Sequence, residues 1–188
     1  MKRMIWTCCC WWLLQTVVIA QSLRPPSELS QLLQTARVEL LEPLESDYHV
    51  LRPSERSTDY QPYDYAIYSR KEKLEIRYLV QPIADGTTAL QLPPHAQFMR
   101  MLTHVASNDE STVIAVHRMA TTDLDTVFLA DWGKEALFSP KSAFSGRTYC
   151  KMLMLHKSEQ ANVFVFFLFD APNTDWEKRY YALQFLPD

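Results

Sequence analysis

A regular alternation of apolar and polar residues marks the stretch from residue 74 to residue 80. Its apolar positions are Leu74, Ile76, Tyr78 and Val80. Glu75 and Arg77 stand between them, and this period of two predicts a β-strand. The charged residues 69–73 separate it from a second strand candidate, Tyr63–Tyr68. We therefore expect an antiparallel hairpin with one solvent-exposed face, on which Glu75 and Arg77 lie.

A second hairpin is predicted near the C-terminus. Tyr149–Leu155 and Val163–Phe169 are both strand-like, and the polar residues 156–160 separate them. Val163–Phe169 is apolar at odd and even positions alike. A strand of this kind is buried on both faces, so we expect it near the centre of the sheet.

Two stretches show the period of a helix. The first is Glu28–Thr35, entered through two prolines and with Ser27 as the expected cap. The second is Pro94–Ala106, which begins with a proline suited to a first helical turn. Its apolar stripe, spaced four and three residues apart, consists of Phe98, Leu102 and Val105.

The remaining apolar runs predict short strands at residues 38–41, 112–116, 127–130 and 181–186. Residues 42–62 are expected to be a loop, and Asp131-Trp132-Gly133 a break in regular structure. The fold class is α+β: a mainly antiparallel sheet of five to seven strands with one or two packed helices. We expect an irregular segment over residues 21–62, with a short helix, followed by an α+β domain over residues 63–188.

The first twenty residues are typical of a secretory signal peptide. Lys2 and Arg3 precede the apolar run Met4–Ala20, whose end suits cleavage after Ala20. The alternative is an uncleaved anchor, but the run is shorter than the roughly 20 apolar residues that span a bilayer. We therefore expect a periplasmic or secreted protein that contacts the membrane only through this segment, during export.

Cleavage changes the composition. The mature chain would hold 17 basic and 22 acidic side chains, and Cys150 would be its only cysteine. An acidic protein without an internal disulfide is held by packing, and its charge argues against nucleic acid or anionic membranes as partners. With only three glycines, the chain has no phosphate-binding loop, and we expect no cofactor.

Catalytic and metal sites have weak support. No two of the mature histidines have the spacing of a metal site. A spatially assembled Cys–His pair would have to join Cys150 to His95, His104 or His117. Cys150, His156 and Asp170 suggest a triad, but a strand would separate the first two by about 20 Å. The carboxylates Asp123, Asp125 and Asp131 would suit a cation or an acid pair, and solvated loop acids are the simpler interpretation.

Aromatic side chains offer a binding hypothesis instead. Tyrosines crowd one region at Tyr48, Tyr60, Tyr63, Tyr65 and Tyr68, and Trp132 and Trp176 lie elsewhere. Flat rings cover the apolar faces of sugars and peptides, although strand packing explains aromatic residues equally well. The candidate residues for binding a protein or saccharide partner are Asp131, Trp132, Tyr63 and Tyr65.

Three stretches, residues 75–78, residues 130–133 with 138–141 after them, and residues 168–170, together resemble an uncharacterised group of exported bacterial proteins. That group implies no activity and no functional residues. The order of elements is also similar to Mog1/PsbP-like α/β/α sandwiches, which mostly serve as binding or assembly factors.

The sequence therefore favours an exported, non-enzymatic binding or accessory protein of the bacterial envelope. One alternative is a secreted hydrolase that uses carboxylates or a spatially assembled Cys–His pair. The other is an envelope protein held by its uncleaved N-terminal segment.

Overall fold

The computed structural model describes residues 26–41, 47–51, 60–83 and 92–187. The predicted signal peptide, residues 1–20, lies outside the described residues. Among the helices within these ranges, none combines the length and the apolar character that crossing a membrane requires.

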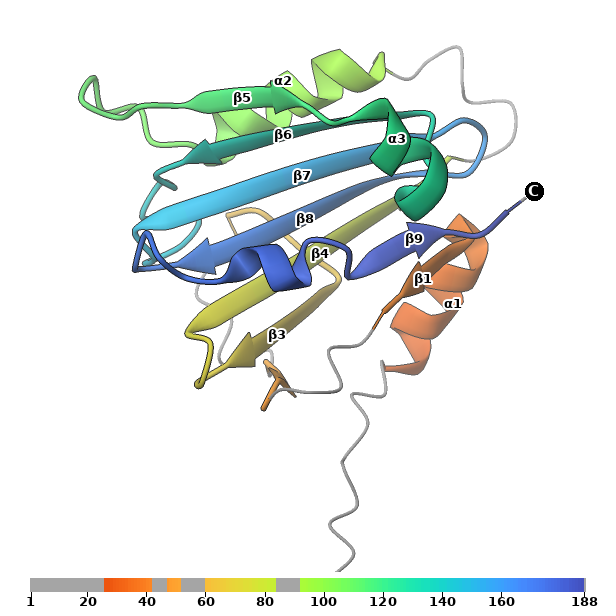
Figure 1. Cartoon of the computed structure of the whole chain (residues 1–188), viewed down its shortest axis with the longest axis horizontal. Coiled ribbons are helices and arrows are strands. Elements are labelled where there is room, and N and C mark those ends of the chain that lie inside the picture. Colours follow the sequence, from red (N-terminus) through yellow and green to blue (C-terminus); the bar gives the residue numbers. More distant parts are fainter. Residues whose placement is uncertain (1–25, 42–46, 52–59, 84–91, 188) are drawn as a thin grey trace, which may run out of the picture.

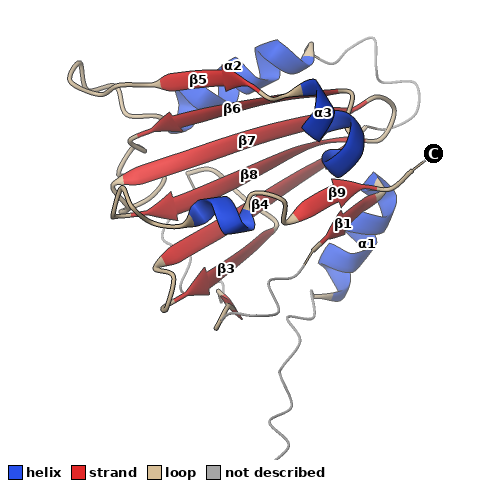
Figure 2. Ribbon diagram, viewed as in Figure 1, coloured by secondary structure: helices blue, strands red, loops and turns tan. Residues whose placement is uncertain are grey.

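An antiparallel sheet of seven strands forms the centre of the described structure (Figures 1 and 2). Its order is β2-β3-β4-β8-β7-β6-β5, so the fold class predicted from the sequence is confirmed. The strands are β2 (His49–Val50), β3 (Tyr65–Ser69), β4 (Leu74–Pro82), β5 (Ala115–Arg118), β6 (Trp132–Phe138), β7 (Tyr149–Lys157) and β8 (Ala161–Phe169). Both predicted hairpins are present, and β8 is the fourth of the seven strands, with every residue buried.

Two apolar clusters cover the two faces of this sheet. On one face, Phe98 and Leu102 of helix α2 (Pro94–Val105) pack against β6, β7 and β8. On the other, Leu29 and Leu33 of helix α1 (Ser27–Ala36) pack with the two-stranded sheet of β1 (Val38–Leu40) and β9 (Leu183–Phe185). The prediction of one solvent-exposed face is therefore wrong, because the cluster that contains Phe144 covers this face and Arg77 is buried against Tyr63 and Phe144.

The N-terminal elements differ in detail from the prediction. Helix α1 includes Ser27 and has Pro26 at its N-cap, with no side-chain cap. Residues 49 and 50, expected in a loop, pair with β3 as β2. Because α1 and β1 bury Leu29, Leu33 and Val38 in the same cluster as β3 and β4, the segment is part of the common core.

The largest error concerns residues 121–138. The strand predicted at residues 127–130 is instead a helical turn, α3 (Thr121–Asp123) continued by η3 (Leu124–Phe128). Leu124 and Phe128 are four residues apart and both face the core, a spacing that the short apolar run 127–130 does not reveal. The expected break at Asp131-Trp132-Gly133 is the start of β6. Gly133 is needed for packing, since a Cβ there would lie 2.6 Å from the Met119 sulfur.

Candidate functional site

The two tyrosines proposed for binding lie in the core. Tyr63 is 7% exposed and Tyr65 is 4% exposed. The guanidinium of Arg77 lies 4.8 Å from the Tyr63 ring centre, whereas Tyr65 packs on Tyr78 in the other cluster. Their rings therefore stabilise the fold and do not form a common surface.

Asp131 and Trp132 are neighbours in sequence with different roles. Trp132 is half-buried and meets Phe98 of α2 edge-on, at 6.3 Å between ring centres. The exposed Asp131 accepts a hydrogen bond of 2.7 Å from the backbone N–H of Ser158 in the β7–β8 turn. Burial raises the pKa of Asp131, but the hydrogen bonds from Ser158 and the nearby His156 outweigh it, so the pKa lies below its usual range. Asp131 thus anchors a turn.

The triad drawn from Cys150, His156 and Asp170 is not assembled. Cys150 is fully buried in the apolar cluster that includes Phe138 and Phe144, and burial raises the pKa of its thiol far above the usual range. His156 lies six residues along β7, about 20 Å away, and contacts Asn162 at 2.8 Å. Asp170 pairs with Arg147 at 2.7 Å. The part of the chain that the structure describes contains no group of three His, Cys, Asp or Glu side chains suited to a metal ion.

Glu75 and Arg77 form a buried ion pair on the face of β4 that was expected to be solvent-exposed. Arg77 donates to Glu75 at 2.6 Å and to the backbone carbonyl of Phe144 at 2.8 Å. The Arg77 side chain is 2% exposed and that of Glu75 is 11% exposed. A buried charge is tolerated only when it is paired and hydrogen-bonded, so this pair belongs to the core.

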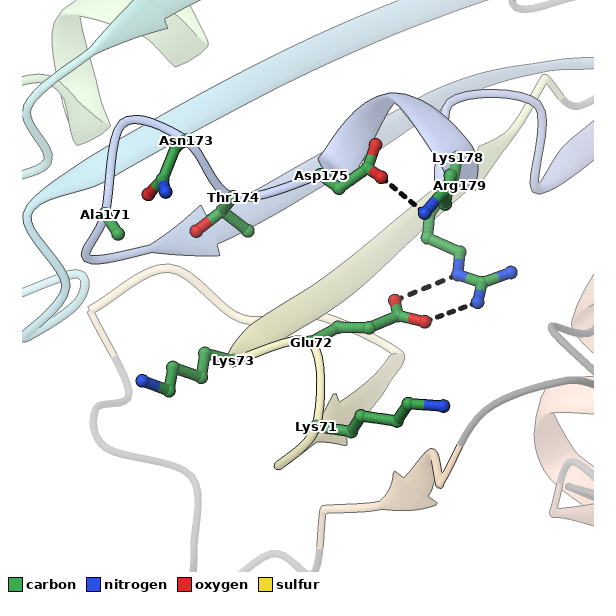
Figure 3. Close-up of a pocket in the computed structure, with 9 residues that line it drawn as sticks. All are labelled: Lys71, Glu72, Lys73, Ala171, Asn173, Thr174, Asp175, Lys178 and Arg179. Carbon is green, nitrogen blue, oxygen red and sulfur yellow. Dashed lines mark hydrogen bonds and ion pairs between the residues drawn. The ribbon is translucent and has the colours of Figure 1, made fainter.

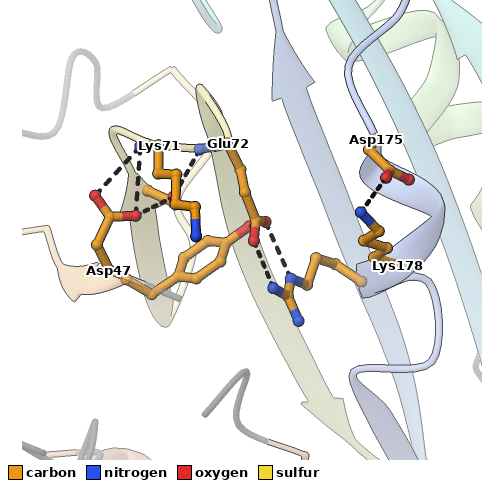
Figure 4. A network of polar contacts seen from close by, with 8 residues as sticks. Asp47, Lys71, Glu72, Asp175 and Lys178 are labelled. Atoms are coloured by element: carbon orange, nitrogen blue, oxygen red, sulfur yellow. Dashed lines mark hydrogen bonds and ion pairs between the residues drawn. The ribbon is translucent and has the colours of Figure 1, made fainter. Parts of the chain in front are cut away.

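The open polar surface lies instead around η4 (Trp176–Arg179), a short 3-10 turn between β8 and β9. Arg179 of η4 donates twice to Glu72 on the β3–β4 turn, at 3.0 and 2.5 Å (Figure 4). Tyr48 donates a third hydrogen bond to Glu72, at 2.7 Å. Asp47 accepts hydrogen bonds from the backbone N–H of Lys71, which ties residue 47 to the same turn. These non-local contacts fix η4 against the sheet although the turn itself is short.

On one side of η4 lies the charged groove, of about 510 Å³ (Figure 3). The β3–β4 turn forms one wall, and the loop after β8 together with η4 forms the other. Four lining residues are cationic and two are anionic. The lining is Lys71, Glu72, Lys73, Ala171, Asn173, Thr174, Asp175, Lys178 and Arg179.

On the other side of η4 lies the aromatic cleft, of about 390 Å³. It is lined by three aromatic and three acidic residues, namely Trp176, Tyr180, Tyr181, Asp123, Glu135 and Glu177. Burial, followed by the hydrogen bond to Glu135, raises the pKa of Tyr180 well above its usual value.

Glu135 is the best-supported polar group of the aromatic cleft. Tyr180 donates to one of its oxygens at 2.6 Å, and the Lys151 ammonium lies 2.7 Å from the other. Lys151 also lies 5.0 Å from the centre of the Trp176 ring. These contacts hold two of the three aromatic rings in place and leave Tyr181, which is 46% exposed, at the surface.

Sequence reasoning found some of these residues and missed others. It singled out Trp176 as aromatic and Asp123 as a candidate carboxylate, and both line the aromatic cleft. It gave no functional weight to Glu72, Arg179 or Glu135, because their partners lie tens of residues away in sequence. Glu135 gave no local signal, because no strand was predicted over residues 132–138.

Comparisons with known proteins leave the family open. No protein-family model matches the chain. No curated protein matches it either.

Proposed function

We propose that this chain is an exported, non-enzymatic binding or accessory protein of the bacterial envelope, with the aromatic cleft as its docking site. The layout of residues 1–20 supports export. The single observation that supports binding is an open cleft in which aromatic rings stand beside carboxylates. Rings cover the apolar faces of a peptide or saccharide while carboxylates accept its hydrogen bonds.

The contacts of the residues that line the cleft favour binding over catalysis. Both oxygens of Glu135 are engaged, by Lys151 and by Tyr180, so this carboxylate acts as a fixed acceptor. Phe128 packs on both Tyr180 and Tyr181 at about 5.7 Å between ring centres, which orients the exposed ring before a partner arrives. A preoriented ring loses little conformational entropy on binding.

Site-specific photo-crosslinking in the source cell tests the docking site. A photoreactive amino acid replaces Tyr181, and the matched control replaces Met99 on α2, at the opposite face of the sheet. The two side chains are equally exposed, at 46% and 47%. We expect a discrete adduct from position 181 and none from position 99, and the adduct's mass distinguishes a protein from a saccharide. Identical patterns from both positions would contradict the proposal.

Export has a separate test. Mass spectrometry of the protein purified from its source should find a chain that begins at Gln21, in the periplasmic or secreted fraction. A membrane fraction whose chain retains residues 1–20 would favour the anchored envelope protein instead.

A secreted hydrolase is the second candidate, because three carboxylates line one cleft. Asp123 and Glu177 form no ion pair with another described residue, which leaves them free to face a substrate. If a glycoside or ester panel reveals turnover, Asp123→Asn with Glu177→Gln should lower kcat by about a hundredfold or more. Unchanged turnover in that variant would exclude the cleft as an active site.

A further inference from the structure

We propose that the charged groove is a second binding site, for a soluble ligand that carries phosphate groups. Lys71 and Lys73 project from the β3–β4 turn on one wall, and Lys178 stands on the other (Figure 3). The site goes beyond the docking function proposed above and does not depend on the aromatic cleft.

The charge balance of the groove supports an anionic ligand. Glu72 is matched by Arg179, and Asp175 is matched by Lys178 at 2.5 Å. Lys71 and Lys73 are exposed and have no ion pair with any residue the structure describes. The lining therefore carries two more positive than negative charges, in a chain whose net charge is −3. Such a local excess attracts anions against the overall charge of the protein.

The groove also supplies a rigid frame and neutral donors. The Glu72–Arg179 pair is bidentate and mostly buried, with side chains 18% and 12% exposed, so it holds the two walls together. Asn173 and Thr174 lie on the loop that faces the turn, and they offer an amide and a hydroxyl (Figure 3). The Lys178–Asp175 pair is largely exposed, so Lys178 is able to exchange Asp175 for a ligand oxygen.

Lysine chemistry favours phosphate among anions. An ammonium group acts as a flexible point charge, which suits the several oxygens of a phosphate. The only arginine in the lining, Arg179, is held by Glu72 and is not presented as a planar fork for a carboxylate. A membrane headgroup carries the same chemistry, but a bilayer is an extended anionic surface that would also meet the net negative charge outside the groove, so we assign a soluble ligand that enters the groove alone.

Calorimetric titration with tripolyphosphate at low ionic strength tests the site. The variant is Lys71→Gln with Lys73→Asn. Lys73 has a positive φ of 54°, a conformation in which asparagine is tolerated well, so the variant should keep its melting temperature. The matched control is Arg100→Gln with Arg118→Gln, which removes the same charge from exposed positions on α2 and β5.

We expect tripolyphosphate to bind, the lysine variant to weaken binding about tenfold, and the arginine control to stay within about twofold. No binding to the unaltered protein, or equal weakening in both variants, would overturn the site. Binding to phosphatidylglycerol vesicles in preference to tripolyphosphate would overturn the soluble ligand. Tyr181→Ala should leave tripolyphosphate binding unchanged, so a failure here is distinguishable from a failure of the aromatic cleft.

Discussion

Two arginine–glutamate pairs involve the same β3–β4 hairpin and differ in what surrounds them. Glu75 and Arg77 both lie on β4, where Tyr63 and Phe144 pack on the arginine, whose side chain is 2% exposed. Glu72, three residues earlier on the turn, pairs with Arg179 from η4, whose side chain is 12% exposed. The first pair also contacts the Phe144 carbonyl and ring, whereas the second borders the charged groove.

The contrast shows how burial decides what an ion pair does. In the sealed pair, each charge depends on its partner because water is excluded. Water reaches the edge of the Glu72–Arg179 pair. This pair joins the two walls of the charged groove, and the neighbouring lysines remain exposed to solvent. Four measurements test this difference between the two pairs.

The largest effect should follow Arg77→Ala. This change leaves Glu75 buried without its main partner, and we expect a loss of about 3–5 kcal/mol in the free energy of unfolding, measured by urea denaturation. Replacing both charges, as Glu75→Gln with Arg77→Met, should restore much of that loss. A loss below about 1 kcal/mol in the free energy of unfolding for Arg77→Ala would show that the Glu75–Arg77 pair is not shielded from water.

The labelling rate of the Cys150 thiol measures how well the face of the sheet that carries Arg77 excludes solvent. Because burial raises the pKa of its thiol and blocks access, labelling with a disulfide reagent at pH 8 should be at least a hundredfold slower than in urea. The measurement uses a chain in which Cys8, Cys9 and Cys10 are replaced by serine. Arg77→Ala should accelerate labelling and Arg179→Ala should not; fast labelling of the unaltered fold would contradict the sealed arrangement.

Arg179→Ala should have a smaller effect on stability. It removes two charge-assisted hydrogen bonds at a partly exposed site, so we expect a loss of about 1–2 kcal/mol. In 1 M salt this loss should shrink, since water and ions screen the pair, whereas the loss in Arg77→Ala should not. The neighbouring variant Lys178→Ala serves as the control, and its free energy of unfolding should equal that of the unaltered chain, because Lys178 is largely exposed. Equal salt dependence of both arginine variants would remove the distinction.

The smallest effect concerns the exposed carboxylate Asp131. Its pKa is lowered in the folded protein, so its stabilising contribution is present above the unfolded pKa of about 3.9 and is lost as the pH falls through the folded pKa. Solvent limits the contribution to about 0.5 kcal/mol. Denaturation between pH 6 and pH 2 should show that the free energy of unfolding falls less steeply with decreasing pH in Asp131→Asn than in the unaltered chain. Identical curves would show that the Ser158 contact contributes nothing.

Local patterns predicted the elements whose signal is complete within one segment. The alternation over residues 74–80 and the apolar stripe of Phe98, Leu102 and Val105 both correspond to observed elements. The apolar run 127–130 failed because four residues fit a strand and a helical turn equally well. Gly133 was taken as a break because its packing partners, Met119 and Leu124, come from other segments.

The candidate site was less predictable than the fold. Tyr63 and Tyr65 carry the residue type expected of a binding surface, but neighbouring strands and helices bury them. Glu72 and Arg179 meet across more than a hundred positions of the chain, and Glu135 meets Tyr180 across 45. No local pattern indicates such pairs, since contacts at this separation depend on how β4, β7 and β8 are ordered in the sheet.

The fold class, the central position of β8 and the expectation of export follow from the sequence, because the hydrophobic period and the order of charged and apolar residues are complete within short segments. Which charged side chains are buried and which border a groove depends on tertiary packing. Arg77 and Arg179 are the same residue type, and they differ in what surrounds them. Tyr63 and Phe144 enclose Arg77, whereas Arg179 packs on the Tyr48 ring and lines the charged groove. Burial is a property of the assembled layers, and it sets the strength of every charge that lies between them.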